Sequence, residues 1–220
     1  MKQENPFTLT FGQKPTEFIS RTEQIGKIIQ TFDMELPSSK VYMIAGVRGS
    51  GKTVSLTEIA DHYANESKWI VLRLSADTDL ISGAISEIKR TAEFHHLDLG
   101  LNINFGVAEL ALSTSKDPIE KDAELRNLLE KIKKQGKRVL FIVDEIVNNA
   151  YVKIFASCFQ IYITNNYPVY LVMAGLYDNI SNLQNEKSLT FLYRAPKIFL
   201  EPLSIPAMTT SYRTVFDISM

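Results

Sequence analysis

The segment Gly46–Thr53 combines three glycines with a lysine and a threonine, in the order GVRGSGKT. This order matches the pattern G-x-x-x-x-G-K-[ST], in which glycines let successive backbone N–H groups turn toward one anion. In that pattern the lysine supplies a positive charge to the outer phosphates of a nucleotide, and the hydroxyl is a ligand for Mg²⁺. The segment therefore predicts a phosphate-binding loop.

Each residue of this loop receives an expected role. Lys52 is assigned to catalysis as well as to phosphate binding, and Thr53 is assigned to the metal. Arg48 lies inside the loop, and we expect it at the rim. The complete predicted set of nucleotide-binding residues around the loop is Gly46, Val47, Arg48, Gly49, Ser50, Gly51, Lys52, Thr53 and Val54.

Two adjacent carboxylates, Asp144 and Glu145, end the apolar stretch VLFIVDE. Open α/β sheets build their sites at the carboxyl ends of such strands. Asp144 is predicted to hold the Mg²⁺ shell, and Glu145 to orient or deprotonate an attacking water. The alternative interpretation is a solvated strand end with a helix-capping acid, but the phosphate-binding loop upstream favours the catalytic one.

Short apolar stretches alternate with amphipathic helical patterns along the chain, and these elements must position the loop and the acids. Strands are predicted at 41–45, 69–74, 138–145 and 169–175, and a last short strand is predicted within 197–203. Strands joined by helical crossovers form parallel sheets, and near-continuous apolar strands need cover on both faces. We therefore expect an α/β fold, a P-loop NTPase three-layer sandwich with a mostly parallel core sheet.

Several local features are expected in addition to this sheet and its helices. Residues 1–17 are predicted as an extended lead-in, and alternating apolar residues predict an inserted β-hairpin near 97–113. Ser20 and Glu23 suggest a capping box at the start of a helix. Asp117 is predicted to cap a later helix that begins at Pro118 and stops at Gly136.

Composition excludes several classes of site. The formal charge of −1 gives no general attraction to nucleic acid, and a single cysteine, Cys158, allows no disulfide and no cysteine-cluster metal site within the chain. Cys158 is expected to be a buried apolar residue, and His62, His95 and His96 are expected at the surface. No signal peptide and no apolar run of ~18 residues is present, which predicts a cytoplasmic protein without a membrane span.

The segments PTEFISRTEQIGKI and YLVMAGLYDNI…LYRAPKIFLEPLS, taken with the loop and the acids, resemble the AAA+-related archaeal-type and origin-initiator-like ATPases. The resemblance implies ATP or ADP with Mg²⁺ as ligands. It implies that Phe18 and Arg21 frame the adenine, and that Arg194 is a catalytic arginine finger directed toward a neighbouring subunit. It also implies a polar sensor after the strand ending at Ala174–Gly175, for which Tyr177, Asp178 and Asn179 are candidates.

The expected function is Mg²⁺-dependent ATP hydrolysis by a nucleotide-controlled switch or motor module. Residues 1–203 would form the ATPase core and 204–220 the start of a truncated helical lid, so we expect a fragment with weak hydrolysis. Self-association through Arg194 is implied, as is DNA binding through a missing C-terminal domain. A non-hydrolysing nucleotide-gated scaffold and a small-molecule P-loop kinase are the alternatives, and the adjacent acids and lack of an arginine-rich lid disfavour the kinase.

Overall fold

The computed structural model describes residues 21–94, 117–202, 205–206, 209–210 and 213. Its core is a five-stranded sheet in the order β2-β3-β4-β1-β5, and every pairing between neighbouring strands is parallel. This confirms the α/β fold with a parallel core sheet. The strands are β1 (Val41–Gly46), β2 (Trp69–Ser75), β3 (Arg138–Asp144), β4 (Val169–Gly175) and β5 (Lys197–Leu200).

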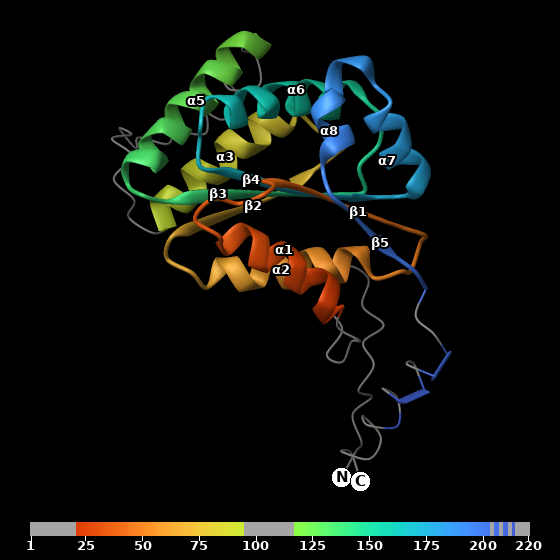
Figure 1. The fold of residues 1–220 in the computed structure, drawn as a ribbon. Coiled ribbons are helices and arrows are strands. Elements are labelled where there is room, and N and C mark those ends of the chain that lie inside the picture. Colours follow the sequence, from red (N-terminus) through yellow and green to blue (C-terminus); the bar gives the residue numbers. More distant parts are fainter. Residues whose placement is uncertain (1–20, 95–116, 203–204, 207–208, 211–212, 214–220) are drawn as a thin grey trace, which may run out of the picture.

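Helices cover both faces of this sheet and complete the three layers (Figure 1). One face carries α1 (Thr22–Asp33) and α2 (Lys52–Ala64). The other face carries the remaining helices: α3 (Leu80–Phe94), α5 (Pro118–Lys134), α6 (Ala150–Thr164), α7 (Tyr177–Gln184), the short 3₁₀ helix η1 (Lys187–Leu189) and α8 (Thr190–Arg194).

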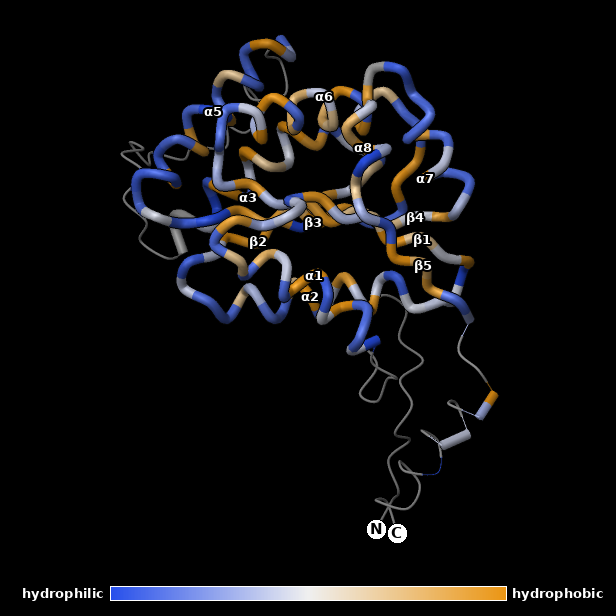
Figure 2. Tube along the Cα trace, in the orientation of Figure 1, coloured by the Kyte–Doolittle hydropathy of each residue, from blue (hydrophilic) through white to orange (hydrophobic). Residues whose placement is uncertain are grey.

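The core consists of two apolar clusters, one on each side of the sheet. Phe141 packs with Phe155 and Phe159 under α6, whereas Phe32 and Tyr63 pack beneath the α1–α2 face. Every residue of β1 and β4 is buried, as strands covered on both faces require. Figure 2 shows the apolar residues gathered on the strands and on the sheet-facing sides of the helices.

The predicted helix caps are confirmed for α5 and not for α1. The Asp117 carboxylate accepts a hydrogen bond from the Ile119 N–H at 3.1 Å, Pro118 is the first helical residue, and Gly136 has a left-handed φ of +67° just beyond α5. In α1, however, Arg21 is the N-cap, and its carbonyl accepts the first helical bond from Ile25 N. The capping box predicted at Ser20 is therefore wrong.

Some predictions fall on residues that the structure does not describe. These are the lead-in 1–17, Phe18, the hairpin near 97–113, His95, His96 and most of 204–220. The described positions within the last segment are helical, and β5, which ends at Leu200, is the short strand predicted within 197–203. No helix in the described part of the chain has both the length and the apolar character needed to cross a bilayer.

Candidate nucleotide-binding site

The predicted site residues meet at one edge of the sheet. β4 pairs with β1 on one side and with β3 on the other, so the carboxyl ends of the three strands lie together. β1 ends at Gly46, where the predicted phosphate-binding loop begins, and β3 ends at Asp144. The strand order thus brings the loop and the acids to the same edge although they are far apart in sequence.

Glycine is required at the three loop positions for two different structural reasons. Gly49 and Gly51 have φ angles of +76° and +89°, a region that other residues adopt only with strain. A Cβ on Gly46 would lie 2.7 Å from the Leu200 carbonyl oxygen and closer still to Ser50 Oγ. The loop is therefore shaped by backbone turning at two positions and by crowding at the third.

The loop leads directly into α2, whose first residue is Lys52. Gly51 is the N-cap and makes no side-chain capping bond, so the N–H groups of the first turn are free to face an anion. Val47 and Arg48 are exposed at the rim, as expected for Arg48, and Val54 is half-buried in the first turn.

The Lys52 ammonium folds back over the loop. Its Nζ donates to the carbonyl oxygen of Val47 at 2.7 Å and to that of Gly46 at 3.1 Å. Burial lowers the pKa of Lys52, while the neighbouring Asp144 and Glu145 act in the opposite direction. The phosphates of a nucleotide would offer this cation stronger partners than two neutral carbonyls.

Thr53 and Asp144 form the second part of the site. The Thr53 hydroxyl donates to Asp144 Oδ2 at 2.6 Å, and Asp144 Oδ1 accepts a bond from the Glu145 N–H at 2.8 Å. A hydroxyl beside a carboxylate is a set of hard oxygen donors that fits Mg²⁺, which takes few protein ligands and completes its shell with phosphate oxygens and water. The described residues contain no cluster of three or more His, Cys, Asp or Glu side chains suited to a metal.

Glu145 has an unusual backbone for a residue with a side chain. Its φ is +50°, and its side chain is exposed at the edge of the sheet next to Asp144. The following N–H, from Ile146, donates to the Ala174 carbonyl at 2.9 Å. Left-handed residues of this kind are held by their surroundings and gather at functional sites. An exposed carboxylate here can accept a bond or a proton from a water.

Arg21 lies nearer to the loop than the sequence indicated. Its Nη2 donates to the Ser50 carbonyl at 3.3 Å and to the Glu201 carbonyl at 2.5 Å. The guanidinium thus joins the phosphate-binding loop to the segment after β5. The adenine contact assigned to Arg21 stays a prediction, and no sequence pattern indicated the contact to Ser50.

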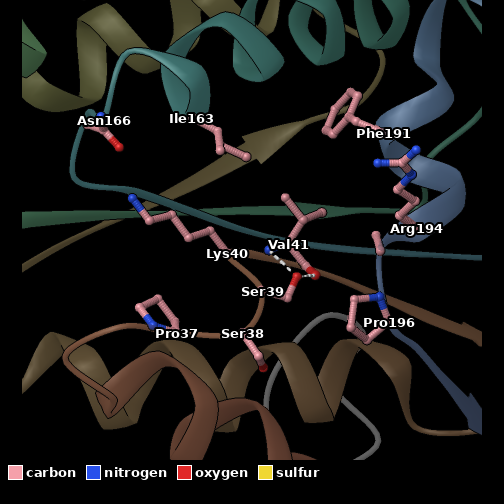
Figure 3. Close-up of a pocket in the computed structure, with 11 residues that line it drawn as sticks. Pro37, Ser38, Ser39, Lys40, Val41, Ile163, Asn166, Phe191, Arg194 and Pro196 are labelled. Atoms are coloured by element: carbon pink, nitrogen blue, oxygen red, sulfur yellow. Dashed lines mark hydrogen bonds between the residues drawn. The ribbon is translucent and has the colours of Figure 1, made fainter.

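Arg194 lies at the opposite end of the strands from the loop, where the amino ends of β1 and β5 meet. It ends α8 just before β5, and it lines a hollow of about 380 Å³ beside Val41, the first residue of β1. Figure 3 shows Arg194 and Lys40 on opposite sides of this hollow. Because the phosphate-binding loop follows the other end of β1, the structure does not bring Arg194 to the site of its own chain.

Three candidates for the sensor, Tyr177, Asp178 and Asn179, follow the end of β4. Tyr177 stacks on Phe199 with ring centres 5.9 Å apart, and its hydroxyl donates to the Leu200 carbonyl at 3.4 Å. Asp178 is exposed and Asn179 half-buried. Within the described part of the chain, no hydrogen bond joins these three side chains to Thr53 or Asp144, so the sensor stays a prediction.

No protein-family model and no curated protein matches the sequence. Solved structures do match the fold. Cdc6p from Pyrobaculum aerophilum has a TM-score of 0.63 at 17% identity, covering 96% of this chain and 52% of that one. The ORC2 protein of Aeropyrum pernix, in ADPNP–ADP complexes, has a TM-score of 0.63 at 14% identity, covering 96% and 54%.

A third similar structure is the ORC1 protein of Aeropyrum pernix in complex with DNA, with a TM-score of 0.56 at 13% identity, covering 91% of this chain and 50% of that one. This chain spans about half the length of each of these proteins. The comparison confirms at the level of the fold the resemblance to origin-initiator ATPases. The chain has the α/β fold of these Cdc6 and ORC proteins, with helices on both faces of a parallel sheet.

Proposed function

We propose that this chain is the nucleotide-binding core of an ATP-hydrolysing switch or motor module. The observation that carries the proposal is the 2.6 Å hydrogen bond between Thr53 and Asp144 beside the glycine-rich loop. This bond joins two side chains to which we assign Mg²⁺, and it lies at the start of α2, where the helix dipole favours an anion. The AAA+ fold of the similar structures supports the same assignment.

Each site residue has a distinct part in this proposal. The backbone N–H groups of the loop and the Lys52 ammonium would bind the β- and γ-phosphates. Thr53 and Asp144 would hold Mg²⁺, which when bound supplies charge neutralisation at the phosphates. Glu145 would orient the attacking water and accept its proton. All of these groups lie at one edge of the sheet, so they would act on a single phosphoryl group.

One observation favours a second candidate, a nucleotide-gated scaffold that binds ATP without hydrolysing it. The tip of β4 ends in Ala174 and Gly175, which offer no polar side chain to a γ-phosphate. A bound nucleotide would then change the contacts of the protein without being consumed. The two candidates share the loop and differ only in turnover.

An assay with ATP labelled in the γ-phosphate tests the proposal. Release of labelled free phosphate that depends on Mg²⁺ and is lost in Lys52→Ala supports hydrolysis. Transfer of label to a small acceptor would instead indicate a kinase. Nucleotide binding without any release would support the scaffold, and the absence of binding would overturn both candidates.

The same proposal includes partners. We propose that copies of the chain associate with Arg194 directed toward the nucleotide of a neighbour, because Arg194 lies away from its own loop. DNA is a further proposed partner, in keeping with the complex in which the Aeropyrum pernix ORC1 protein was solved. Size-exclusion chromatography with and without ATP, and with a DNA duplex, tests both. Unchanged elution in every case would contradict them.

A further inference from the structure

Gly175, the last residue of β4, is glycine because another part of the chain occupies the place of its side chain. A Cβ at this position would lie 2.8 Å from Ile146 Cγ1, 3.1 Å from the Ile146 carbonyl oxygen and 3.6 Å from Ile146 N. Separations below 3.0 Å are essentially never found for real Cβ atoms. The φ of Gly175 is not in the left-handed region, so the backbone alone does not require glycine here.

Ile146 is the residue that follows Glu145, and it is fixed on both its main chain and its side chain. Its N–H donates to the Ala174 carbonyl at 2.9 Å, and its side chain is fully buried, at 0% exposure. A residue bonded to the tip of β4 and packed against it has little freedom to move. The bare α-carbon of Gly175 is what allows this close approach.

Glu145 is therefore held from both sides. Its own N–H donates to Asp144 Oδ1 at 2.8 Å, and the next N–H is tied to β4. Between these two anchors the φ of Glu145 is +50°, a conformation that a residue with a Cβ adopts only when its surroundings enforce it. The direction in which the Glu145 carboxylate leaves the sheet depends on both anchors.

We propose that Gly175 is a positioning residue for Glu145, acting through Ile146. This inference rests on the proposed function, since it concerns the carboxylate to which the attack of water is assigned. It also accounts for the missing polar residue at the tip of β4: the space that a side chain at 175 would fill is taken by Ile146, the residue after Glu145. Any side chain at 175 would displace Ile146 and shift Glu145 with it.

The test compares Gly175→Ala with a matched glycine-to-alanine control. Gly83→Ala is suitable, because a Cβ there would meet only Leu74 Cδ2, at an ordinary contact distance of 3.5 Å. We expect Gly175→Ala to lower the single-turnover rate of ATP hydrolysis by about 10-fold or more while the ATP dissociation constant changes less than about twofold, since misplacement of a catalytic group costs rate rather than binding. Gly83→Ala should leave both unchanged.

A double-mutant cycle shows whether Gly175 acts through Glu145. In a Glu145→Gln background, Gly175→Ala should cost little further rate, because residues that act as one unit are not additive. The double variant Gly175→Ala/Ile146→Ala, which removes the atom 2.8 Å away, should recover part of the lost rate. Additive losses in the cycle, or an equal loss of ATP affinity, would overturn the proposal.

A second readout does not require catalysis. Displacement of Ile146 would break its bond to the Ala174 carbonyl, so hydrogen exchange at the Ile146 amide should be faster in Gly175→Ala than in the wild type and in Gly83→Ala. Unchanged protection of this amide would overturn the inference alone. A wild-type protein that binds ATP but releases no phosphate would overturn the proposed hydrolysis instead, so the two failures are distinguishable.

Discussion

The hydroxyl of Thr53 and the carboxylate of Asp144 are 91 residues apart in sequence and 2.6 Å apart in space. The bond joins the first turn of α2 to the end of β3 across the tip of β4, which separates β1 from β3 in the sheet. The two expected metal ligands are thus brought together by the fold of the protein alone. Thr53 and Asp144 would hold a cation that entered the site, with the hydroxyl offering an oxygen lone pair and the carboxylate a negative charge.

Lys52→Ala should weaken ATP binding while the fold is retained. The described hydrogen bonds of this side chain go only to two loop carbonyls, so its loss leaves no buried charge without a partner. Charged hydrogen bonds contribute about 1.5–3 kcal/mol, which predicts a rise in the dissociation constant of roughly 10- to 100-fold. Titration calorimetry measures it, with the exposed Lys187→Ala as control. Unchanged affinity for ATP would contradict the assignment of this loop to phosphate binding.

Glu145→Gln should bind ATP normally and hydrolyse it slowly. The substitution keeps the size of the side chain and removes its capacity to accept a proton, and general-base catalysis contributes about 10²-fold or more. Phosphate release under saturating ATP is the measurement, and Glu35→Gln, at an exposed position, is the control. Equal turnover in the mutant and the wild type would make Glu145 a solvated strand-end acid.

Arg21→Gln distinguishes a contact to the adenine from support of the loop. If the guanidinium positions the loop through the Ser50 carbonyl, affinity for ATP and GTP should fall together, by roughly 10-fold for one charged hydrogen bond. The preference for ATP over adenosine should shrink at the same time. Fluorescence titration with the three ligands provides the test. A loss confined to ATP and adenosine, with GTP unaffected, would place Arg21 at the base.

Arg194→Ala should lower ATP turnover only when copies of the chain are assembled. Because Arg194 lies at the edge of the sheet opposite the loop, ATP binding by the monomer should not change. Turnover by the assembly should fall by ~10³-fold, the lower end of arginine-finger effects. Lys40→Ala, which changes another cation of the same hollow, is the matched control. Weaker ATP binding by the monomeric variant would show that Arg194 acts within its own chain.

Cys158 should be an unreactive thiol near neutral pH. Burial, followed by the charge of Asp122, raises the pKa of Cys158 to about 11. The fold therefore favours the protonated thiol: this contribution to stability is complete below the unfolded pKa of about 8.5 and is lost as the pH rises toward 11. Iodoacetamide at pH 8 should label the denatured chain far faster than the folded one, as followed by mass. Equal rates would contradict the assignment.

The sequence predicted the strands well because the sheet is buried on both faces, which makes each strand a nearly continuous apolar run. Residues 169–175 form β4 as expected. Helices α7 and α8 were not predicted, because they are short and bury few apolar residues: Ile180 and Leu183 in α7, and Leu192 in α8. Local sequence does not contain the tertiary packing that makes such segments helical.

The same limit applies to the site. The loop could be predicted because its chemistry lies in eight consecutive residues, and Asp144 because it ends an apolar strand. The contacts of Arg21 with Glu201, and of Gly175 with Ile146, join segments distant in sequence. A glycine at a strand end was the only cue to the second, and it does not identify the residue that fills the space.

The position of β1 in the sheet determines when the site can form during synthesis on the ribosome. Ile44 of β1 pairs with Ala174 on one side and with Ile198 on the other, so both neighbours of this strand emerge long after it does. Until then its apolar residues have no partner strand, a condition that exposes a nascent chain to aggregation. Gly46 is likewise packed against the Leu200 carbonyl, near the end of β5. The nucleotide site is therefore incomplete until β4 and β5 have both left the ribosome, and bound ATP cannot protect β1 before that stage.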